Sequence, residues 1–331
     1  MINILLVGAG SVGQIHAANL VDHPGVNFFG IADIDTQRAE ALAARHAVRA
    51  LPAAEKIDPG VDAVIIASST AAHAEAVRAC LGGGHHLLCE KPLSRDIAET
   101  RTLVSQAASA NLVCAVGFNR RFAPEYIDLR EAVRRGKIGK PEMLSFISRS
   151  EAPPSPDFLL SSGGLFGEKG SHFYDLTRWI TDENPSEVFA MGSVLVNPAY
   201  RQVHEVDTAA ILMRLPSGAL VKFDFSWRAA YGQDERLEVF GSRGMVQMLQ
   251  PLAGHTVLTD GRGRHQDGPV PSWRTRFLTS YAAELDAFVA AIKGDKQPQL
   301  ATLADGLAAQ QLADAAARSV QENRPISITP G

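Results

Sequence analysis

A lysine between a buried strand and a helix is well placed in this sequence to do chemistry. Lys91 follows the apolar run Leu87-Leu88-Cys89, which predicts a buried strand, and precedes a helix entry at Leu93-Ser94-Arg95-Asp96. Open α/β sheets bind ligands at the carboxyl ends of their strands, and Lys91 lies at such an end. Pro92 stiffens the backbone behind it. We therefore expect Lys91 to contact both a cofactor and a substrate hydroxyl.

A second pair of chemistry-bearing residues, Glu168 and His172, lies in the stretch 163–175. If this stretch is helical, the two side chains are at positions i and i+4 and share one face. A carboxylate beside an imidazole raises its basicity and orients it, as a general base requires. The alternative is an ion pair on a helix surface. The presence of Lys91 favours the general base.

A glycine pattern, G-x-G-x-x-G, occupies the turn Gly8-Ala9-Gly10-Ser11-Val12-Gly13. An apolar strand precedes it, a helical pattern follows, and an acid ends the next strand, which is the context of a dinucleotide site. Gly8 permits the tight turn, and Gly10 lets the backbone approach a pyrophosphate at the helix N-terminus. The alternative is a glycine-rich turn with no ligand, and the context favours dinucleotide binding.

The acid that ends the second strand is Asp33. Its carboxylate can accept hydrogen bonds from both adenosine ribose hydroxyls, and it would repel a 2′-phosphate. The next basic residue is Arg38, which favours NAD over NADP. The alternative is a helix-capping acid, although Asp35 is better placed to cap.

A cluster of hydroxyl groups, Ser68-Ser69-Thr70, ends the third predicted strand, and His73 follows it. These hydroxyls can line the nicotinamide side of a cofactor channel. They can also cap the next helix, by Thr70 or a neighbour, and both roles are compatible. We expect His73 to pack or to position the cofactor rather than to act in catalysis.

Short strands and helices alternate as far as residue 121. Strands are expected at 2–7, 26–32, 61–67, 87–89 and 112–117, and helices at 14–21, 36–45, 73–81 and 97–108. This alternation predicts a parallel, doubly wound α/β sheet. We assign residues 1–121 to an N-terminal Rossmann dinucleotide-binding domain.

After residue 121 the pattern becomes that of an α+β domain. A helix at 126–134 precedes runs typical of antiparallel strands at 143–148, 188–196, 208–215, 220–227, 236–240 and 245–248, and helices at 280–292 and 303–320 close the chain. Turns are predicted at Pro216-Ser217-Gly218 and Ser242-Arg243-Gly244. Ala152 to Asp157 is expected to be a rigid loop. We assign residues 122–331 to a C-terminal domain with a large, mostly antiparallel open sheet.

Composition excludes several classes of protein. The 331 residues carry a formal net charge of −4, which is too small to indicate nucleic acid or an anionic membrane as partner. Three cysteines without C-x-x-C spacing predict a reducing compartment and no structural disulfide. The sequence shows no signal peptide and no apolar run long enough to span a membrane, so a cytoplasmic protein is expected. Neither a metal site nor a hydrolytic nucleophile is evident.

Four stretches together resemble the glucose–fructose oxidoreductase / inositol 2-dehydrogenase (Gfo/Idh/MocA) family. They are Gly8 to Gly13, Glu90-Lys91-Pro92, Gly117-Phe118-Asn119-Arg120-Arg121-Phe122, and His172 with its upstream acid. The resemblance covers essentially the whole chain. Within the family, the stretches most similar to inositol 2-dehydrogenases are Ala67-Ser68-Ser69-Thr70, Arg228 to Arg236, and Tyr281 to Phe288.

The resemblance implies roles for three side chains. Lys91 would contact nicotinamide and substrate and polarise the reacting hydroxyl, and His172 would take the hydroxyl proton as hydride leaves. The acid is usually Asp in the family, and Glu168 is a departure, because one extra methylene displaces the carboxylate. Lys169 beside it is also unusual for an inositol enzyme. Both departures bear on the identity of the substrate more than on the type of reaction.

The expected binding residues follow from the motifs and the resemblance. Cofactor contacts are expected from Gly8, Gly10, Ser11, Val12, Gly13, Asp33, Ser68, Ser69, Thr70, His73, Glu90, Lys91, Pro92 and Asn119. Substrate contacts are expected from Lys91, Arg120, Glu168, His172 and Tyr231. Arg120 could instead form a structural ion pair, and Tyr231 could instead belong to the core or to a hairpin edge.

The expected activity is NAD-dependent oxidation of a secondary hydroxyl of a cyclic polyol or sugar, most similar to that of an inositol 2-dehydrogenase. The alternatives are an NAD(P)-dependent sugar or keto-sugar oxidoreductase of the same family, and a non-catalytic NAD-binding regulator on the same fold. The family resemblance implies homodimers or homotetramers formed through the second sheet. An apolar exposed face, indicated by Val194, Leu212 and Phe223, would support such assembly.

Overall fold

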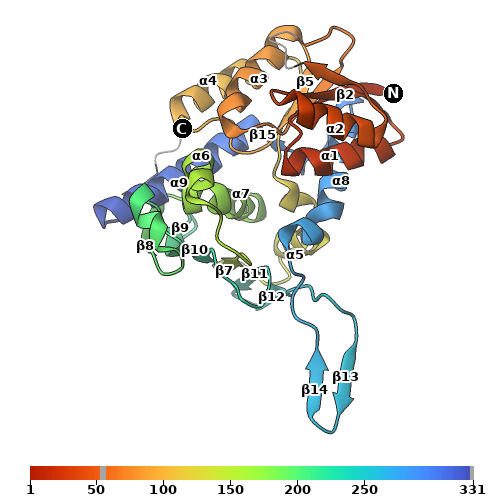
Figure 1. The fold of residues 1–331 in the computed structure, drawn as a ribbon. Helices are drawn as coiled ribbons and strands as arrows, with labels where there is room; N and C mark the ends of the chain where they lie inside the picture. Colours follow the sequence, from red (N-terminus) through yellow and green to blue (C-terminus); the bar gives the residue numbers. More distant parts are fainter. Residues whose placement is uncertain (53–56, 329–331) are drawn as a thin grey trace. The chain divides into compact units, whose positions relative to one another are not determined.

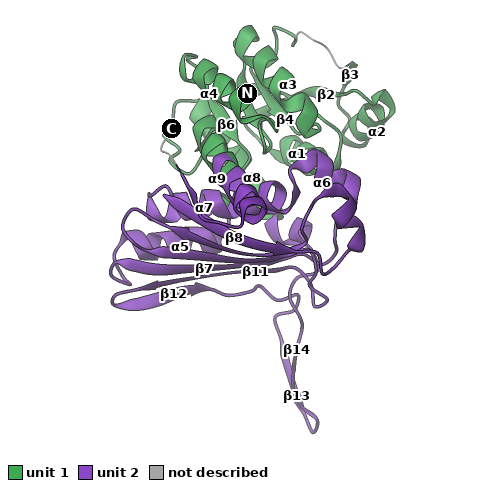
Figure 2. Cartoon of the chain, turned by 90° about the vertical axis from the view of Figure 1, so that its left-hand side faces the viewer, with its two compact units in different colours: residues 1–122, 278–310 green, residues 123–277, 311–331 purple. Residues whose placement is uncertain are grey.

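The computed structural model describes residues 1–52 and 57–328. The chain divides into two compact units, coloured separately in Figure 2. Unit 1 contains residues 1–122 and 278–310, and unit 2 contains residues 123–277 and the chain from residue 311 onward. The division near residue 122 lies next to the predicted domain boundary. Residues 278–310, which the sequence pattern placed in the C-terminal domain, group with unit 1.

Unit 1 is built on a seven-stranded sheet of order β15-β6-β5-β4-β1-β2-β3. Its strands are β1 (Ile2–Val7), β2 (Val26–Asp33), β3 (Ala50–Pro52), β4 (Ala63–Ile66), β5 (His86–Cys89), β6 (Cys114–Val116) and β15 (Ala301–Thr302). All neighbouring strands are parallel except β15, which runs antiparallel to β6. The parallel, doubly wound sheet is confirmed. Strand β3 was not predicted, because its three residues carry no buried run.

Helices cover both faces of this sheet, as Figure 1 shows. They are α1 (Ser11–Asp22), α2 (Thr36–His46), α3 (Thr70–Gly83) and α4 (Ile97–Ala108). Strand order runs from β1 to β2 in one direction and from β4 to β5 in the other, so right-handed crossovers place α1 and α3 on opposite faces. On the α1 face, Ile4 and Leu6 join Leu20 and the Phe288 ring of α8 (Trp273–Ile292) in one apolar core.

The sheet of unit 2 has the order β12-β11-β7-β10-β9-β8-β16. Its strands are β7 (Pro141–Arg149), β8 (Glu187–Ser193), β9 (Thr208–Arg214), β10 (Leu220–Ser226), β11 (Asp234–Gly241), β12 (Gly244–Met248) and β16 (Ile326–Ser327). Strands β7 and β10 pair in parallel, and the other pairs are antiparallel. The expectation of a mostly antiparallel sheet is confirmed. Gly218, with φ +91°, closes the predicted turn between β9 and β10.

Helices of unit 2 pack on one face of its sheet, where aromatic side chains form the core. The helices are α5 (Pro124–Arg134), α6 (Pro156–Ser162), α7 (Gly170–Thr181) and the last part of α9 (Leu303–Glu322). Phe173 and Tyr174 of α7 contact Phe146, Phe223 and Phe225 of the sheet. Phe223 is 2% exposed, so the prediction that it belongs to an exposed apolar face was wrong. It alternates with exposed neighbours in β10, and the period of two places it inward.

The opposite face of this sheet, called here the outer sheet face, carries exposed apolar side chains. They are Met143, Met191, Leu212, Leu220, Phe240 and Met245. A hairpin of β13 (Val257–Asp260) and β14 (Gly263–Gln266) extends away from the sheet of unit 2, as Figure 2 shows. All eight of its strand residues are exposed. The hairpin was not predicted, because it lacks alternation of apolar and polar residues.

Four segments differ from the sequence expectation or connect the larger elements. The predicted rigid loop Ala152 to Asp157 ends early, because α6 begins at Pro156 with Ser155 accepting a hydrogen bond from the Phe158 N–H as its cap. Short helical turns η1 (Asn119–Phe122), η2 (Leu165–Lys169) and η3 (Pro198–Val203) complete the fold. Within the described residues, no helix has the length and apolar character needed to cross a membrane.

Candidate functional site

The glycine loop of unit 1 is shaped by close backbone approaches. Gly8 has φ +108°, and a Cβ there would lie 2.4 Å from the Ala67 carbonyl group. A Cβ on Gly13 would lie 2.0 Å from the Gly8 oxygen. At Gly10, by contrast, no heavy atom of the described residues lies within 4 Å of the Cβ position, apart from Gly10 itself and its chain neighbours. Two of the glycines therefore close the turn, and the third leaves its backbone open to a ligand.

The open side of Gly10 belongs to a hollow of about 370 Å³. Its lining residues are Ala9, Gly10, Ser11, Gln14, Arg38, Ala41, Leu42 and Arg45. Helix α1 begins at Ser11, so the N–H groups of its first turn and its dipole favour an anion here. Two guanidinium groups add positive charge. The residues present therefore fit the pyrophosphate of a dinucleotide.

Asp33 ends β2 beside this loop. Its Oδ2 accepts a hydrogen bond from the Ala9 N–H at 2.7 Å, and its Oδ1 accepts one from the Asp35 N–H at 2.8 Å. A carboxylate has about four lone-pair sites, so both oxygens keep capacity for ribose hydroxyls. As expected, Asp35 rather than Asp33 caps α2, through the Arg38 N–H.

The third strand end holds Ser68, Ser69 and Thr70 where predicted. Val7 of β1 pairs with Ile66 of β4, so this strand end neighbours the glycine loop at the point where strand order reverses. Ser69 is the N-cap of α3, which begins at Thr70. Among the described residues, the buried Ser68 Oγ has no hydrogen-bond partner, which suits a ligand at this edge.

His73 reaches from α3 to two backbone carbonyl groups. Its Nδ1 lies 2.7 Å from the Pro92 oxygen, and its Nε2 lies 3.1 Å from the Ser68 oxygen. Burial lowers the pKa of His73 below its ordinary value, against the raising effect of the two carbonyl groups. Both ring nitrogens are directed at the protein backbone.

Glu90 and Lys91 follow β5, as predicted, and the Lys91–Pro92 peptide bond is cis. Glu90 Oε1 lies 2.9 Å from Nε2 of His16, which belongs to α1 and is fully buried. A Cβ on Gly117 would lie 2.9 Å from Glu90 Oε2, so the glycine at 117 leaves room for this carboxylate. The pair of His16 and Glu90 was not predicted from the sequence. A histidine on the buried face of the helix after the glycine loop was the available signal.

Asn119 and Arg120 lie in η1, directly after β6. Asn119 is buried, and its Nδ2 donates to Ser280 Oγ of α8 at 3.1 Å. Asn119 Oδ1 has no hydrogen-bond partner among the described residues.

Unit 1 brings the glycine loop, Asp33, Ser68 and Lys91 to the carboxyl edge of one sheet.

Glu168 and His172 belong to unit 2 and flank a change of helix type. Glu168 lies in η2, a π-helical turn, and His172 lies in the first turn of α7. The sequence expectation placed these two residues at i and i+4 of one helix, but a wider π-helical turn precedes α7 at this point. Single π-turns inside helices occur frequently at functional sites. Gly164 precedes the turn with φ +68°, and a Cβ there would lie 2.1 Å from a Glu205 carboxylate oxygen.

Lys169 extends from the same π-turn into unit 2. Its Nζ donates to Ser150 Oγ at 2.6 Å and to Ser148 Oγ at 3.3 Å, and it lies 4.5 Å from the centre of the Trp227 ring. The side chain is buried. Lys169, which is unusual for an inositol enzyme, thus bonds to serines at the end of strand β7.

Tyr231 is half exposed and belongs to a charged network of unit 2. Its hydroxyl donates to Asp234 Oδ2 at 2.6 Å and accepts from Arg149 Nη1 at 3.2 Å, and Arg149 also pairs with Asp224. Partial burial and the Asp234 carboxylate raise the pKa of Tyr231, against the lowering effect of Arg149. The hydroxyl therefore stays protonated at neutral pH.

The family models match this chain over most of its length. Residues 2–118 match the oxidoreductase family's NAD-binding Rossmann fold, and residues 130–328 match its C-terminal alpha/beta domain. The chain belongs to the Gfo/Idh/MocA oxidoreductase family. Its NAD-binding Rossmann unit has the glycine loop and the Asp33 carboxylate described above.

Several members of the Gfo/Idh/MocA family align with the whole chain. The myo-inositol 2-dehydrogenase of Thermotoga maritima is 37% identical, with 98% of this chain and 97% of that protein covered. The inositol 2-dehydrogenase of Rhizobium meliloti is 34% identical, with 98% of each chain covered. The scyllo-inositol dehydrogenase from Lactobacillus casei, solved with NAD(H) and scyllo-inositol, has a TM-score of 0.91 at 26% identity and 99% coverage of each chain.

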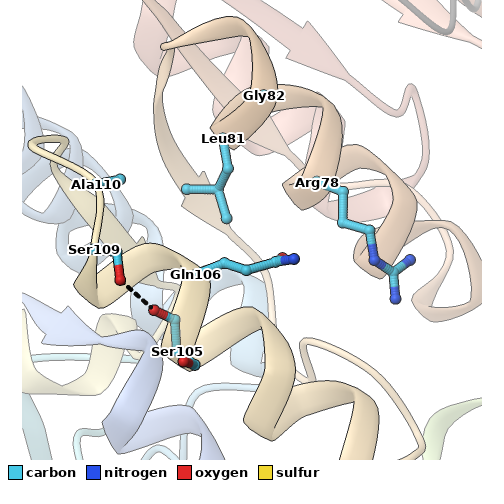
Figure 3. A pocket seen from close by; sticks show the side chains of 7 residues that line it. All are labelled: Arg78, Leu81, Gly82, Ser105, Gln106, Ser109 and Ala110. Carbon is cyan, nitrogen blue, oxygen red and sulfur yellow. Dashed lines mark hydrogen bonds between the residues drawn. The ribbon is translucent and has the colours of Figure 1, made fainter.

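A second surface hollow in this Gfo/Idh/MocA protein lies apart from the predicted residues. Its volume is about 520 Å³, and Figure 3 shows it between α3 and α4. Its lining residues are Arg78, Leu81, Gly82, Ser105, Gln106, Ser109 and Ala110. None of these described residues is a predicted site residue, so the larger hollow is not the candidate site.

Proposed function

We propose that this protein is an NAD-dependent dehydrogenase that oxidises a secondary hydroxyl of a cyclic polyol, with an inositol as the substrate. The observation that carries the proposal is similarity over nearly the full length to two named inositol 2-dehydrogenases at 34% and 37% identity. The Lactobacillus casei relative, solved with scyllo-inositol and NAD(H), supports the same substrate class. The glycine loop, the N-terminus of α1 and the Asp33 carboxylate support NAD as the cofactor.

In the proposed reaction, the carbinol loses a hydride and a proton and becomes a ketone. NAD, when bound, accepts the hydride from the carbinol carbon. Lys91 donates a hydrogen bond to the hydroxyl oxygen and stabilises the negative charge that develops there. His172 accepts the hydroxyl proton, and the Glu168 carboxylate favours the imidazolium that results. No bond to the protein forms in this scheme.

The remaining site residues have binding roles in the proposal. The Gly8 to Gly13 turn holds the pyrophosphate, Asp33 accepts from the ribose, and Ser68, Ser69, Thr70 and Asn119 line the nicotinamide side. Arg120 and Tyr231 hydrogen-bond substrate hydroxyls. The Tyr231 hydroxyl carries out this role from a fixed position, since Asp234 and Arg149 both hold it.

A different sugar substrate is the second candidate. Glu168 stands where the family usually has Asp, and Lys169 buries an ammonium group beside it. These two residues favour a substrate whose hydroxyl pattern differs from that of myo-inositol. The reaction type and the cofactor are unchanged in this candidate.

We also propose that the protein works in the cytoplasm as a homodimer or homotetramer. The outer sheet face of unit 2 supports assembly, because exposed apolar side chains from six of its strands share this face.

A substrate panel tests the proposed function. Purified protein is mixed with NAD or NADP and with myo-inositol, scyllo-inositol, glucose or galactose, and formation of the reduced cofactor is followed by absorbance. Turnover with an inositol and NAD supports the proposal. Turnover with an aldose alone supports the second candidate, and NAD binding without turnover across the panel would instead indicate a regulator on this fold.

A further inference from the structure

Two histidines of unit 1 contact the segment that carries Lys91, and each does so from a different helix. His16 of α1 contacts the Glu90 side chain, and His73 of α3 contacts the Pro92 carbonyl group. Lys91 is the one residue between these two points in the chain. Because α1 and α3 lie on opposite faces of the sheet, the segment is held from both faces.

On the α3 face, His73 joins two strand ends. The Pro92 oxygen follows β5, and the Ser68 oxygen follows β4, so one imidazole spans the gap between adjacent strand ends. Carbonyl oxygens only accept hydrogen bonds, so each contact needs a hydrogen on the ring nitrogen that makes it. The shorter distance, 2.7 Å, assigns the hydrogen of the neutral ring to Nδ1 and thus to Pro92.

On the α1 face, the Glu90 carboxylate fits between two elements. His16 Nε2 lies 2.9 Å from one carboxylate oxygen, and the backbone of Gly117 lies against the other. Among the described residues, His16 Nδ1 has no hydrogen-bond partner. A hydrogen on Nδ1 would therefore be buried without an acceptor, which places the hydrogen on Nε2, where it is donated to Glu90. The Tyr281 ring packs edge-on against His16 at 5.5 Å and fixes the plane of the imidazole.

From these contacts we propose that His73 and His16 are positioning residues that set the place of the Lys91 ammonium group for hydride transfer. The inference rests on the proposed function, because it concerns the site of that reaction. Neither histidine touches the reacting atoms in this proposal. A lysine side chain is long and flexible, so the place of its ammonium group depends on where the chain holds Lys91. His16 holds the Glu90 side chain before it, and His73 holds the Pro92 carbonyl group after it.

The first test compares His73→Leu with His73→Gln. Leucine removes the Nδ1 donor to the Pro92 oxygen and the Nε2 contact with the Ser68 oxygen, whereas the glutamine amide group can donate a hydrogen to the Pro92 oxygen. We expect His73→Leu to lower kcat on an inositol by about 100-fold, the loss associated with a displacement of about 1 Å. We expect NAD affinity to be retained and His73→Gln to recover most of the loss.

His85 provides the matched control. It is also buried and also directs a ring nitrogen at a backbone carbonyl group, Val61 O at 2.7 Å, but it precedes β5 and so lies at the opposite end of the strand from Lys91. His85→Leu should lower the melting temperature as His73→Leu does and leave kcat unchanged. Equal losses of kcat in the two leucine variants would overturn the proposal.

The second test does not depend on turnover. Hydrogen–deuterium exchange of peptides that cover Glu90 to Leu93 is measured in the wild type and the variants. Faster exchange in His73→Leu and His16→Leu, with recovery in His73→Gln and His16→Gln, supports the inference. Unchanged exchange in both leucine variants contradicts it. If the wild type turns over no inositol, the proposed function fails while the exchange result still decides whether the two histidines hold this segment.

Discussion

The Asp33 carboxylate ties the end of β2 to the glycine loop, because its Oδ2 accepts a hydrogen bond from the Ala9 N–H at 2.7 Å. The same carboxylate accepts from the Asp35 N–H. Three functions thus meet in one side chain: closing the loop, starting the turn into α2, and accepting from the ribose in the proposed complex.

Asp33→Ala should weaken NAD binding. We expect the Kd to rise at least about tenfold, since a hydrogen bond to a charged group contributes about 1.5–3 kcal/mol. The preference for NAD over NADP should fall at the same time, because the repulsion of a 2′-phosphate is removed. Calorimetric titration with both cofactors measures this. Asp96→Ala is the control, because it removes only the cap of α4. Unchanged NAD affinity in Asp33→Ala would show that the carboxylate only accepts hydrogen bonds from the Ala9 and Asp35 N–H groups and does not bind the ribose.

Lys91→Ala should abolish turnover while NAD still binds. We expect a loss in kcat of at least 10²-fold, the size found when one donor to a developing oxyanion is removed. Steady-state kinetics and NAD titration on the same sample separate the two effects. Lys296→Ala, at an exposed residue that follows α8, is the control for loss of a positive charge. Normal turnover of Lys91→Ala on the true substrate would refute the proposed role.

Glu168→Gln should lower kcat/KM and leave the melting temperature nearly unchanged. The carboxylate favours the imidazolium form of His172 in the proposed mechanism, and the amide removes that charge with little change in volume. We expect a loss of about tenfold to 100-fold. Glu168→Asp, which restores the usual family residue, should retain activity and change the relative rates on different inositols. If both variants behave as the wild type, Glu168 has no part in proton transfer.

Asp207 should make the stability of unit 2 depend on pH. Burial raises the pKa of Asp207. Four hydrogen bonds together lower it by more than burial raises it, and they come from the N–H groups of Leu195, Val196 and Asn197 and from the Thr208 hydroxyl. The pKa of Asp207 therefore lies below the ordinary 3.8. A depressed folded-state pKa contributes stability above about pH 4, and this is lost as pH falls through the folded pKa.

The Asp207→Asn variant tests that contribution. We expect its free energy of unfolding to fall by about 1–3 kcal/mol at pH 7, because an amide cannot accept all of these hydrogen bonds. The difference from the wild type should shrink at acidic pH. Asp260→Asn, on the exposed hairpin, should have no measurable effect. Denaturant unfolding at several pH values measures both, and a pH-independent difference would contradict the assignment.

Leu212→Glu should disrupt the proposed assembly. Leu212 is 54% exposed on the outer sheet face, and a carboxylate there would be buried in an interface between copies. Light scattering should show assemblies of the wild type and the 35.5 kDa monomer for the variant. Val21→Glu, at an exposed apolar residue of α1, is the control. A monomeric wild type would exclude the homo-oligomer.

The sequence predicted the elements whose residues have strong local preferences. The turn from Gly8 to Gly13 was predictable because no other residue fits at Gly8 or Gly13, and Asp33 was predictable because it ends the next strand. β3 and the hairpin of β13 and β14 were not predictable, because neither carries a buried apolar pattern. The placement of Phe223 depends on which face of β10 the helix α7 covers, which is a tertiary fact.

The pair of His16 and Glu90 shows why the site was only partly predictable. The two residues are 74 positions apart, and their contact depends on the register between α1 and the end of β5. The motifs identify each stretch separately, and hydrogen bonds across the sheet are set by packing. The same holds for His73, whose two carbonyl partners lie on different strand ends.

The close fit of Glu90 against Gly117 has a consequence for how this sheet edge can evolve. A side chain at 117 would displace this carboxylate, whose Oε2 lies 2.9 Å from the Cβ position, and would disturb its contact with His16. The two positions should therefore covary among homologues: a shorter residue at 90 permits alanine at 117, whereas glutamate at 90 favours glycine there.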